Sequence, residues 1–244
     1  MFQRIWYGLG RALVSLFALI ALKMNVLWKA RRPDGPVILV ANHPSTSDPA
    51  IITTLVSEPT SILIKDVLFK VPLFGRSLRM SGHIPVAVGG GQAALDEAEK
   101  MLRAGRSVVI FPEGEISPIE GGLHRPRTGA ARLALRTGAP VIPVGIGLDP
   151  RCMQILETKV EGKAELGTWY FHGPYAMTVG DPMYFRGSEE DRELVRRVSQ
   201  QMINCIADLA DESRARLNEA YPTYGMSLPI RVFNFGMRLL VRVA

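Results

Sequence analysis

A histidine and a carboxylate five residues apart, His43 and Asp48, stand in the stretch LVANHPSTSDPAI at residues 39–51. A neutral imidazole can accept a proton at one ring nitrogen while its other nitrogen donates to a carboxylate, which fixes the tautomer and stabilises the imidazolium that forms. This pair corresponds to the base and orienting residue of a serine-hydrolase triad. The chain has no Gly-x-Ser-x-Gly sequence to carry a nucleophile. A hydroxyl or amine of an acceptor substrate could therefore attack directly, without an acyl-enzyme.

A structural role is also open to both residues. Asp48 precedes Pro49, and an aspartate at the N-cap followed by proline is a common helix start. His43 could equally be a loop histidine whose ring nitrogens are satisfied by neighbours, because this spacing alone is weak evidence for catalysis. The two roles are compatible, since a capping carboxylate is held rigidly enough to orient an imidazole.

Short apolar runs rich in β-branched residues alternate with helical patterns through the middle of the chain. The apolar runs cover residues 37–41, 61–64, 107–111 and 141–146, and the helical patterns cover residues 49–57, 92–103, 129–136 and 189–218. Strands of this length, buried on both faces and separated by helices, predict an α/β fold with a largely parallel sheet flanked by helices. Residues 153–185 are more typical of antiparallel additions to that sheet.

Polar residues follow two of these predicted strands directly. His43 comes after residues 37–41, while Pro112, Glu113 and Gly114 come after residues 107–111. The carboxyl ends of parallel strands meet at one edge of the sheet, where ligands bind in open α/β folds. We therefore expect His43 and Glu113 to face one another over a shared cleft.

The composition excludes several classes of function. A chain of 244 residues with 47% hydrophobic residues is long enough for one sizeable core. The two cysteines, Cys152 and Cys205, fit neither a metal-ligand spacing nor a disulfide framework. We expect a protein of a reducing compartment, with no metal site and no bound cofactor.

The net charge of +6 comes entirely from the two ends of the chain. Residues 1–32 hold six basic residues and no acid, and residues 226–244 hold three arginines and no acid, so residues 33–225 keep 20 bases against 23 acids. A nucleic-acid-binding domain would need a basic core, so we expect no nucleic-acid partner.

Both basic ends are also apolar, with arginines that fall on a narrow stripe at helical spacing. This pattern predicts interfacial helices on an anionic membrane surface at residues 1–33 and 226–244, on either side of a domain at residues 34–225. The uncharged run at residues 12–22 is shorter than the roughly 20 residues that a spanning helix needs. We expect a monotopic protein at the cytoplasmic face of a membrane. Helices packed on the core are the alternative, because amphipathicity alone does not separate the two.

Four blocks in order, NHPSTSD, FPEGEIS, RPRTGAARLAL and APVIPVGI, resemble the glycerolipid acyltransferase family, which includes 1-acylglycerol-3-phosphate acyltransferases. The resemblance covers about residues 36–185. The HX4D motif of the first block is matched by His43 and Asp48. FPEGEIS corresponds to the family's third block, which is matched by Phe111, Pro112, Glu113, Gly114 and Ser117. APVIPVGI corresponds to the family's fourth block, which is matched by residues 141–144.

The resemblance implies an O-acyltransferase of phospholipid biosynthesis. It would move a fatty acyl group from acyl-CoA or acyl-carrier protein to a membrane lipid acceptor, with His43 as general base and Asp48 orienting it. The residues of the third block, with Glu115, would contact the substrate.

Two arginines that hold the acceptor phosphate in the family are absent. Glu115 and Ile116 replace Thr-Arg in the third block, and Val88 stands where the second block has arginine. Either Arg125 and Arg127 supply the missing cations, or the acceptor carries no phosphomonoester and is a lysophosphodiester, an amino-acid lipid or a glycolipid. Arg125 and Arg127 could also be no more than a solvated basic loop.

Two other functions fit the same residues. A non-catalytic lipid-binding relative would keep the fold without the chemistry, and a lipase or thioesterase would use His43 and Asp48 to activate water.

Overall fold

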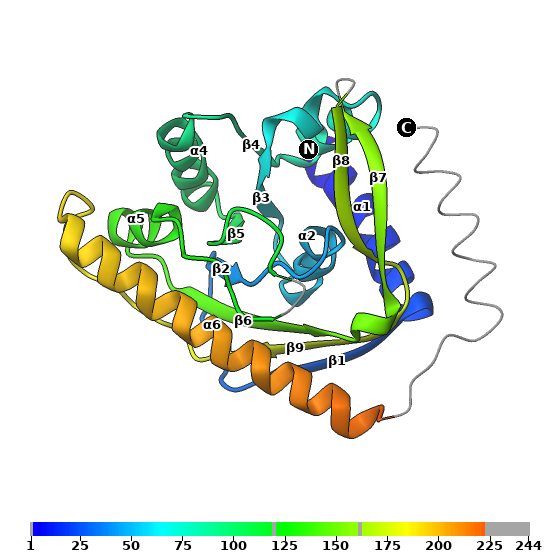
Figure 1. Cartoon of the computed structure of the whole chain (residues 1–244). Coiled ribbons are helices and arrows are strands. Elements are labelled where there is room, and N and C mark those ends of the chain that lie inside the picture. The colour runs from blue at the N-terminus through cyan, green and yellow to red at the C-terminus, as the bar shows by residue number, and fades with distance from the viewer. Residues whose placement is uncertain (1, 119–120, 161–162, 223–244) are drawn as a thin grey trace.

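The computed structural model describes residues 2–118, 121–160 and 163–222. In this part of the chain, one sheet has the strand order β1-β9-β6-β2-β5-β3-β4, and β7 and β8 form a separate hairpin (Figure 1). The strands are β1 (Leu22–Trp28), β2 (Ile38–Ala41), β3 (Thr60–Lys65), β4 (Ile84–Val86), β5 (Ser107–Ile110), β6 (Val141–Leu148), β7 (Met153–Val160), β8 (Lys163–Tyr170) and β9 (Gly173–Val179).

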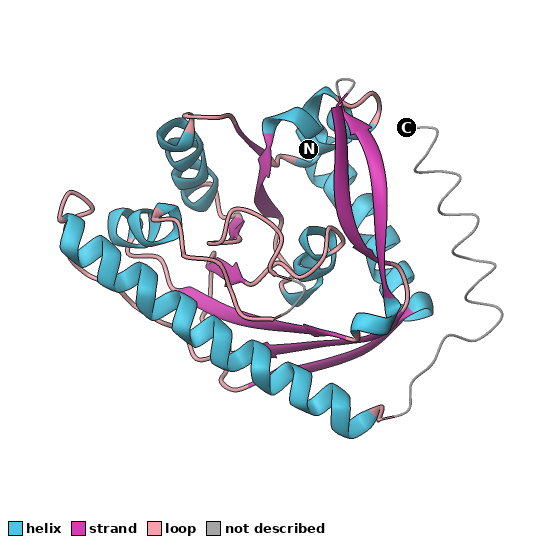
Figure 2. Ribbon diagram, viewed as in Figure 1, coloured by secondary structure: helices cyan, strands magenta, loops and turns pink. Residues whose placement is uncertain are grey.

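The helices lie on both faces of this sheet (Figure 2). They are α1 (Phe2–Ala21), α2 (Asp48–Ile51), α3 (Phe74–Ser81), α4 (Gly91–Arg103), α5 (Gly129–Thr137) and α6 (Arg192–Ala220), with short 3₁₀ turns η1 (Ile52–Leu55), η2 (Asp66–Lys70) and η3 (Pro150–Cys152). The predicted C-terminal helix at residues 226–244 lies outside the described residues.

The predicted α/β fold is confirmed. Strands β6, β2, β5, β3 and β4 run parallel to one another, whereas β9 pairs antiparallel with β6. Residues 153–185 do supply antiparallel pairs, because β7 and β8 also form an antiparallel hairpin.

Alternate residues of β2 enter two separate cores. Ile38 and Val40 pack with α4, α5 and α6, while Leu39 and Ala41 pack with α1 and α2. Because helices cover both faces, every residue of β2 is buried, and a strand of this kind reads as a continuous apolar run. This rigid double layer holds the carboxyl end of β2, where His43 follows.

The predicted helix over residues 1–33 is wrong beyond Ala21. Helix α1 ends there, and Leu22–Trp28 forms β1, an edge strand that pairs in parallel with β9. The backbone of this segment bonds to the neighbouring strand along one side. The N-terminal segment is therefore partly built into the sheet and is not separate from the domain that follows.

Three basic residues of this segment have partners within the protein, although the charge pattern predicts that they face lipid headgroups. Arg11 donates from Nη1 to the Ser57 carbonyl at 2.8 Å, and Lys29 Nζ lies 2.5 Å from Glu212 Oε2. Arg32 is ion-paired with Glu58. The large side chains that α1 exposes are apolar: Ile5, Leu9, Leu13, Leu16, Leu19 and Ile20. None of the described helices combines the length and the apolar character that a membrane span requires.

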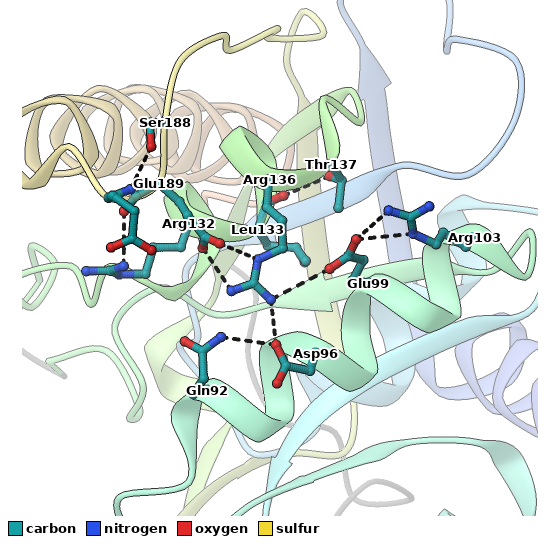
Figure 3. A network of polar contacts seen from close by, with 11 residues as sticks. Gln92, Asp96, Glu99, Arg103, Arg132, Leu133, Arg136, Thr137, Ser188 and Glu189 are labelled. Carbon is teal, nitrogen blue, oxygen red and sulfur yellow. Dashed lines mark hydrogen bonds and ion pairs between the residues drawn. The ribbon is translucent and has the colours of Figure 1, made fainter.

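An ion-pair network joins α4, α5 and the segment before α6 (Figure 3). The guanidinium of Arg136 donates two hydrogen bonds to Glu189, at 2.7 and 2.9 Å, and a third to Asp96 at 2.6 Å. These hydrogen bonds, led by those to Glu189, raise the pKa of Arg136. Its side chain is only 13% exposed. The network therefore links α4, α5 and the segment before α6 on the outer side of this helix layer.

Replacing Arg136 with alanine should lower the free energy of unfolding by about 2 kcal/mol, because it leaves a half-buried carboxylate pair without its cation. Arg103 provides the matched control. It bonds to Glu99 on the same helix but is largely exposed, so Arg103→Ala should cost no more than about 0.5 kcal/mol. Urea unfolding of both variants measures the difference, and equal costs would contradict a tertiary role for Arg136.

Candidate active site

Asp48 is completely buried at the start of α2. The residue at the N-cap is Ser47, so the prediction that Asp48 caps this helix is wrong. Its carboxylate turns back to accept hydrogen bonds from the Ser45 amide at 2.6 Å and from the Ser45 hydroxyl at 2.7 Å. A third donor is the hydroxyl of Tyr175 on β9, at 2.8 Å. Three hydrogen bonds therefore hold the carboxylate in place in addition to its contact with His43.

His43 completes this set, with Nδ1 lying 3.2 Å from Asp48 Oδ2. A carboxylate only accepts hydrogen bonds, so the hydrogen-bonded tautomer carries its proton on Nδ1 and leaves Nε2 as the basic nitrogen. Burial and the neighbouring Asp48 raise the pKa of Tyr175 well above its ordinary value, so its hydroxyl remains a donor. The sequence stretch at residues 43–48 therefore folds into the geometry of a base and its orienting carboxylate.

The imidazole is also held on one face. Its ring stacks on Phe111 with ring centroids 4.2 Å apart and an interplanar angle of 22°. The side chain of His43 keeps 16% of its surface exposed, so it is not sealed inside the core. Phe111, which was predicted to contact substrate, therefore orients the ring.

The loops after β2 and β5 meet at the expected edge of the sheet, whereas a shared cleft between His43 and Glu113 stays a prediction. The amide of His43 donates to Glu113 Oε1 at 3.2 Å and to Ser117 Oγ at 3.0 Å, and the Ser117 amide donates to the His43 carbonyl at 2.9 Å. The Ser117 hydroxyl donates to Glu113 at 2.5 Å, and the second oxygen of Glu113 accepts from the His124 amide at 2.9 Å. Glu113 is buried, and these contacts make it an anchor for the His43 loop. A substrate contact for Glu113 or Ser117 stays a prediction.

Arg127 lies against the third block. Its amide donates to the buried Pro112 carbonyl at 2.7 Å. Gly114 has a positive φ of 73°, and a Cβ atom there would lie only 2.2 Å from the Arg127 Nε. Glycine at this position therefore leaves room for the guanidinium. Arg127 and Glu115 are both exposed.

Arg125, although only two residues away, has different surroundings. It lines a cavity of about 330 Å³ between its own loop and α6, where Gln200 and Asn204 lie opposite. The two arginines predicted to share a phosphate thus have separate neighbours.

The hairpin and β6 support the His43 loop, which the sequence pattern did not show. The Thr46 amide donates to the Thr168 carbonyl at 2.6 Å, and the Tyr170 amide donates to the Ser47 hydroxyl at 3.1 Å. Asn42 bonds through both ends of its side-chain amide to the backbone of Ile146, at 2.7 and 2.9 Å. The one available sequence signal was Asn42 itself, a polar residue at the end of a buried strand.

Two other histidines, the half-buried His83 and the buried His172, lie away from this site. His83 accepts from the Ile62 amide at Nδ1, and burial, with the nearby Arg106 cation, lowers its pKa to about 4. Burial also lowers the pKa of His172. In the described part of the chain, no three His, Cys, Asp or Glu side chains are grouped to hold a metal ion.

Comparisons with known proteins found a matching family model and several similar proteins. The model of the family described as Acyltransferase matches residues 23–147, which include His43, Asp48 and the third block. The chain is 28% identical over 188 residues to a chloroplastic 1-acyl-sn-glycerol-3-phosphate acyltransferase of Brassica napus, covering 74% of this chain and 49% of that protein. It is 36% identical over 112 residues to the 1-acyl-sn-glycerol-3-phosphate acyltransferase of Borreliella burgdorferi, covering 44% of each.

Two further matches are informative. An N-acylphosphatidylethanolamine synthase of Arabidopsis thaliana is 30% identical over 132 residues, covering 50% of this chain and 45% of that protein. The crystal structure of the 1-acyl-sn-glycerophosphate acyltransferase PlsC from Thermotoga maritima has a TM-score of 0.57 at 20% identity, covering 92% of this chain and 81% of that one, which shows a common fold. The chain spans about half the length of the curated relatives it matches.

Proposed function

This chain belongs to the acyltransferase family, and we propose that it transfers a fatty acyl group from acyl-CoA or acyl-carrier protein to the hydroxyl of a lysophospholipid. The observation that carries the proposal is the hydrogen bond from His43 Nδ1 to the buried Asp48, which leaves Nε2 as a base on a partly exposed ring. No bound cofactor is needed for this chemistry.

His43 Nε2 accepts the proton of the acceptor hydroxyl while the hydroxyl oxygen attacks the thioester carbonyl carbon. Asp48 stabilises the imidazolium that forms. When the tetrahedral intermediate collapses, the carbon–sulfur bond breaks and the leaving sulfur takes the proton from Nε2. The products are an ester and a free thiol, and the imidazole is neutral again.

Transfer must be separated from hydrolysis, because the same base could activate water. The experiment compares thiol release from one acyl thioester with and without added lysolipid, together with the lipid product. A lysolipid-dependent thiol release that matches ester formation supports transfer. Equal release without lysolipid would favour a thioesterase, and no release would favour a lipid-binding relative.

We propose lysophosphatidate as the acceptor, with Arg127 holding its phosphate. Support comes from the guanidinium beside Gly114 and from two relatives named as 1-acyl-sn-glycerol-3-phosphate acyltransferases. Arg127 would then replace the cation that Ile116 does not provide. Arginine suits this role because its planar group can donate two hydrogen bonds to one phosphate. A lysophosphodiester or an amine-bearing acceptor is the alternative, since one relative is named for N-acylation of phosphatidylethanolamine.

Replacing Arg127 with alanine should raise the KM for lysophosphatidate about ten- to a hundredfold, the worth of a charge-assisted hydrogen bond. The KM for a lipid that lacks phosphate should not change. Arg186, an exposed arginine beyond β9, provides the control, and Arg186→Ala should leave both constants unchanged. A parent enzyme that prefers acceptors without phosphate would contradict the assignment.

We propose that the exposed apolar face of α1 binds the membrane surface, where the lipid acceptor resides. Leu9 and Leu13 are exposed one turn apart on this face, and such a face is buried in the bilayer interface when a helix lies along it. The double variant Leu9→Gln/Leu13→Gln keeps good helix formers, so it should weaken binding to anionic vesicles at least about tenfold without unfolding α1. Cosedimentation measures this effect. Unchanged binding would mean that lipid does not cover this face.

A further inference from the structure

A strained turn stands between η2 and α3. Leu73 has φ 61° and ψ −52°, and it is the one residue other than glycine with positive φ in the described part of the chain. The Phe74 amide donates to the Pro72 carbonyl across it at 2.6 Å. This is a γ-turn of the rare kind with positive φ, a conformation that is strained for an L-residue. A leucine here therefore needs an explanation.

The fold itself does not supply one. The Leu73 side chain is 84% exposed and Phe74 is 51% exposed, so neither residue recovers the cost through core packing. The turn is nevertheless held firmly, because the Gly75 amide donates to the Val71 carbonyl at 2.8 Å. A Cβ atom on Gly75 would lie 2.1 Å from the Phe69 carbonyl oxygen, which shows how tightly the chain is folded back. The protein thus displays two large apolar side chains on a rigid turn.

This turn belongs to the edge of the sheet that carries His43. Strand β3 runs parallel to β5, and β5 runs parallel to β2, so all three have their carboxyl ends at one edge. The short η2 follows β3 there and leads into the turn. Val88, which follows the parallel strand β4 by two residues, is also fully exposed. Apolar side chains therefore emerge from two neighbouring connections at the edge where the candidate site lies.

The surroundings of the turn are basic. Lys70, Arg76 and Arg79 are exposed around it, and Asp66 is the one acid between residues 65 and 80. Exposed apolar side chains with exposed cations close by in sequence fit a bilayer with anionic headgroups, because the apolar side chains enter the acyl region while the cations remain among the headgroups. An apolar groove on a protein partner would not account for this charge.

The turn also adjoins the helix already proposed to bind lipid. Helix α1 packs against α3, and Trp6 Nε1 donates to Ser77 Oγ at 3.4 Å. The start of α1, with its exposed Ile5, is therefore next to the helix that begins at Phe74.

We propose that Leu73 and Phe74 are a second bilayer anchor, which inserts into an anionic membrane and turns the carboxyl edge of the sheet toward the lipid. Together, this anchor and α1 fix the orientation of the protein on the membrane. A single helix lying in the interface would not fix that orientation. If the proposed acyl transfer is correct, on which this consequence rests, a lysolipid reaches His43 without leaving the bilayer.

The experiment uses the full chain and vesicles of phosphatidylcholine with phosphatidylglycerol. Leu73→Gly should raise the urea midpoint of unfolding, because glycine accepts positive φ, while it weakens vesicle binding about tenfold. Tyr184 is the matched control. It is 64% exposed. It follows Met183, which forms a β-bridge with the first residue of β6. Tyr184 therefore lies near the amino ends of the parallel strands, opposite the edge of the sheet that carries His43. Tyr184→Gln should leave vesicle binding unchanged.

Depth of insertion provides an independent readout. In the variant Leu73→Trp, the added fluorescence should shift to the blue and be quenched by lipids brominated on the acyl chain, whereas that of Tyr184→Trp should not. Parent-like vesicle binding by Leu73→Gly, or equal quenching of the two tryptophan variants, would overturn the proposal. Neither readout needs catalysis, so failure of the acyl-transfer proposal would leave both interpretable. With a short-chain acceptor dissolved as monomers, Leu73→Gly should be as active as the parent.

Discussion

Replacing His43 with alanine is expected to lower kcat for acyl transfer by about 10³- to 10⁴-fold, at the upper end of what general-base catalysis contributes. The KM for both substrates should change little, because the imidazole is proposed to act on the proton of the acceptor and not to hold either substrate. Initial rates of thiol release with saturating lysolipid measure this effect. The rate that remains in the variant should come from the binding of both substrates next to each other.

Two controls make this result interpretable. The side chain of His43 is mostly buried against Phe111, so circular dichroism and the urea midpoint must show that the variant still folds. The main-chain hydrogen bonds of residue 43 to Glu113 and Ser117 survive the substitution, which should keep the loop in place. An unchanged rate in a folded variant would remove His43 from the chemistry and favour a lipid-binding relative.

The meeting of His43 and Glu113 could be predicted from sequence because it follows from two local facts. Each residue comes directly after a short apolar run, and strands buried on both faces are typical of a parallel sheet. Parallel strands have their carboxyl ends at one edge of the sheet, so both loops are expected at that edge whatever the strand order. The observed strand order places β2 and β5 side by side, which closes the distance to a hydrogen bond.

Tyr175 could not be predicted in the same way. It reaches Asp48 across 127 residues of sequence, from a strand that runs antiparallel to β6. Its position depends on the register of β9, and a tyrosine in an apolar strand gives no local sign of a polar partner. Ser45 was equally hidden, because a serine in a turn-rich loop has many possible partners.

The first segment shows why an amphipathic pattern can be misread. The stripe with Arg11 and Lys29 is real, but charge at helical spacing does not say which side faces the protein. Both cations find acceptors in the fold, Arg11 on the Ser57 carbonyl and Lys29 on Glu212. The pattern also continued past Ala21 into a run that is long enough for an edge strand, and short apolar runs are ambiguous between helix and strand.

Replacing Asp48 with asparagine is expected to lower kcat by about 10³-fold while the active-site loop keeps its shape, since the orienting carboxylate of such pairs is worth nearly as much as the base. Asparagine has the same size, and its amide oxygen can still accept from the Ser45 amide and from His43 Nδ1. It carries no charge, however, so it does not stabilise the imidazolium that forms when Nε2 takes the proton of the acceptor hydroxyl. The KM for lysolipid should stay within about twofold of the parent value, because Asp48 is buried and its replacement does not change how the lysolipid binds before the reaction.

The donors to Asp48 allow a graded test of the same idea. Tyr175→Phe removes one hydrogen bond and leaves the two from Ser45, so kcat should fall only about three- to tenfold, the worth of one hydrogen bond. Tyr170 is the matched control: it is as deeply buried, packs edge-on against Tyr175, and donates to the Pro174 carbonyl and not to Asp48. Tyr170→Phe should cost similar stability and leave kcat unchanged. If both tyrosine variants slowed catalysis equally, packing of this core and not the hydrogen bond to Asp48 would set the rate, and the orienting role of the carboxylate would lose its support.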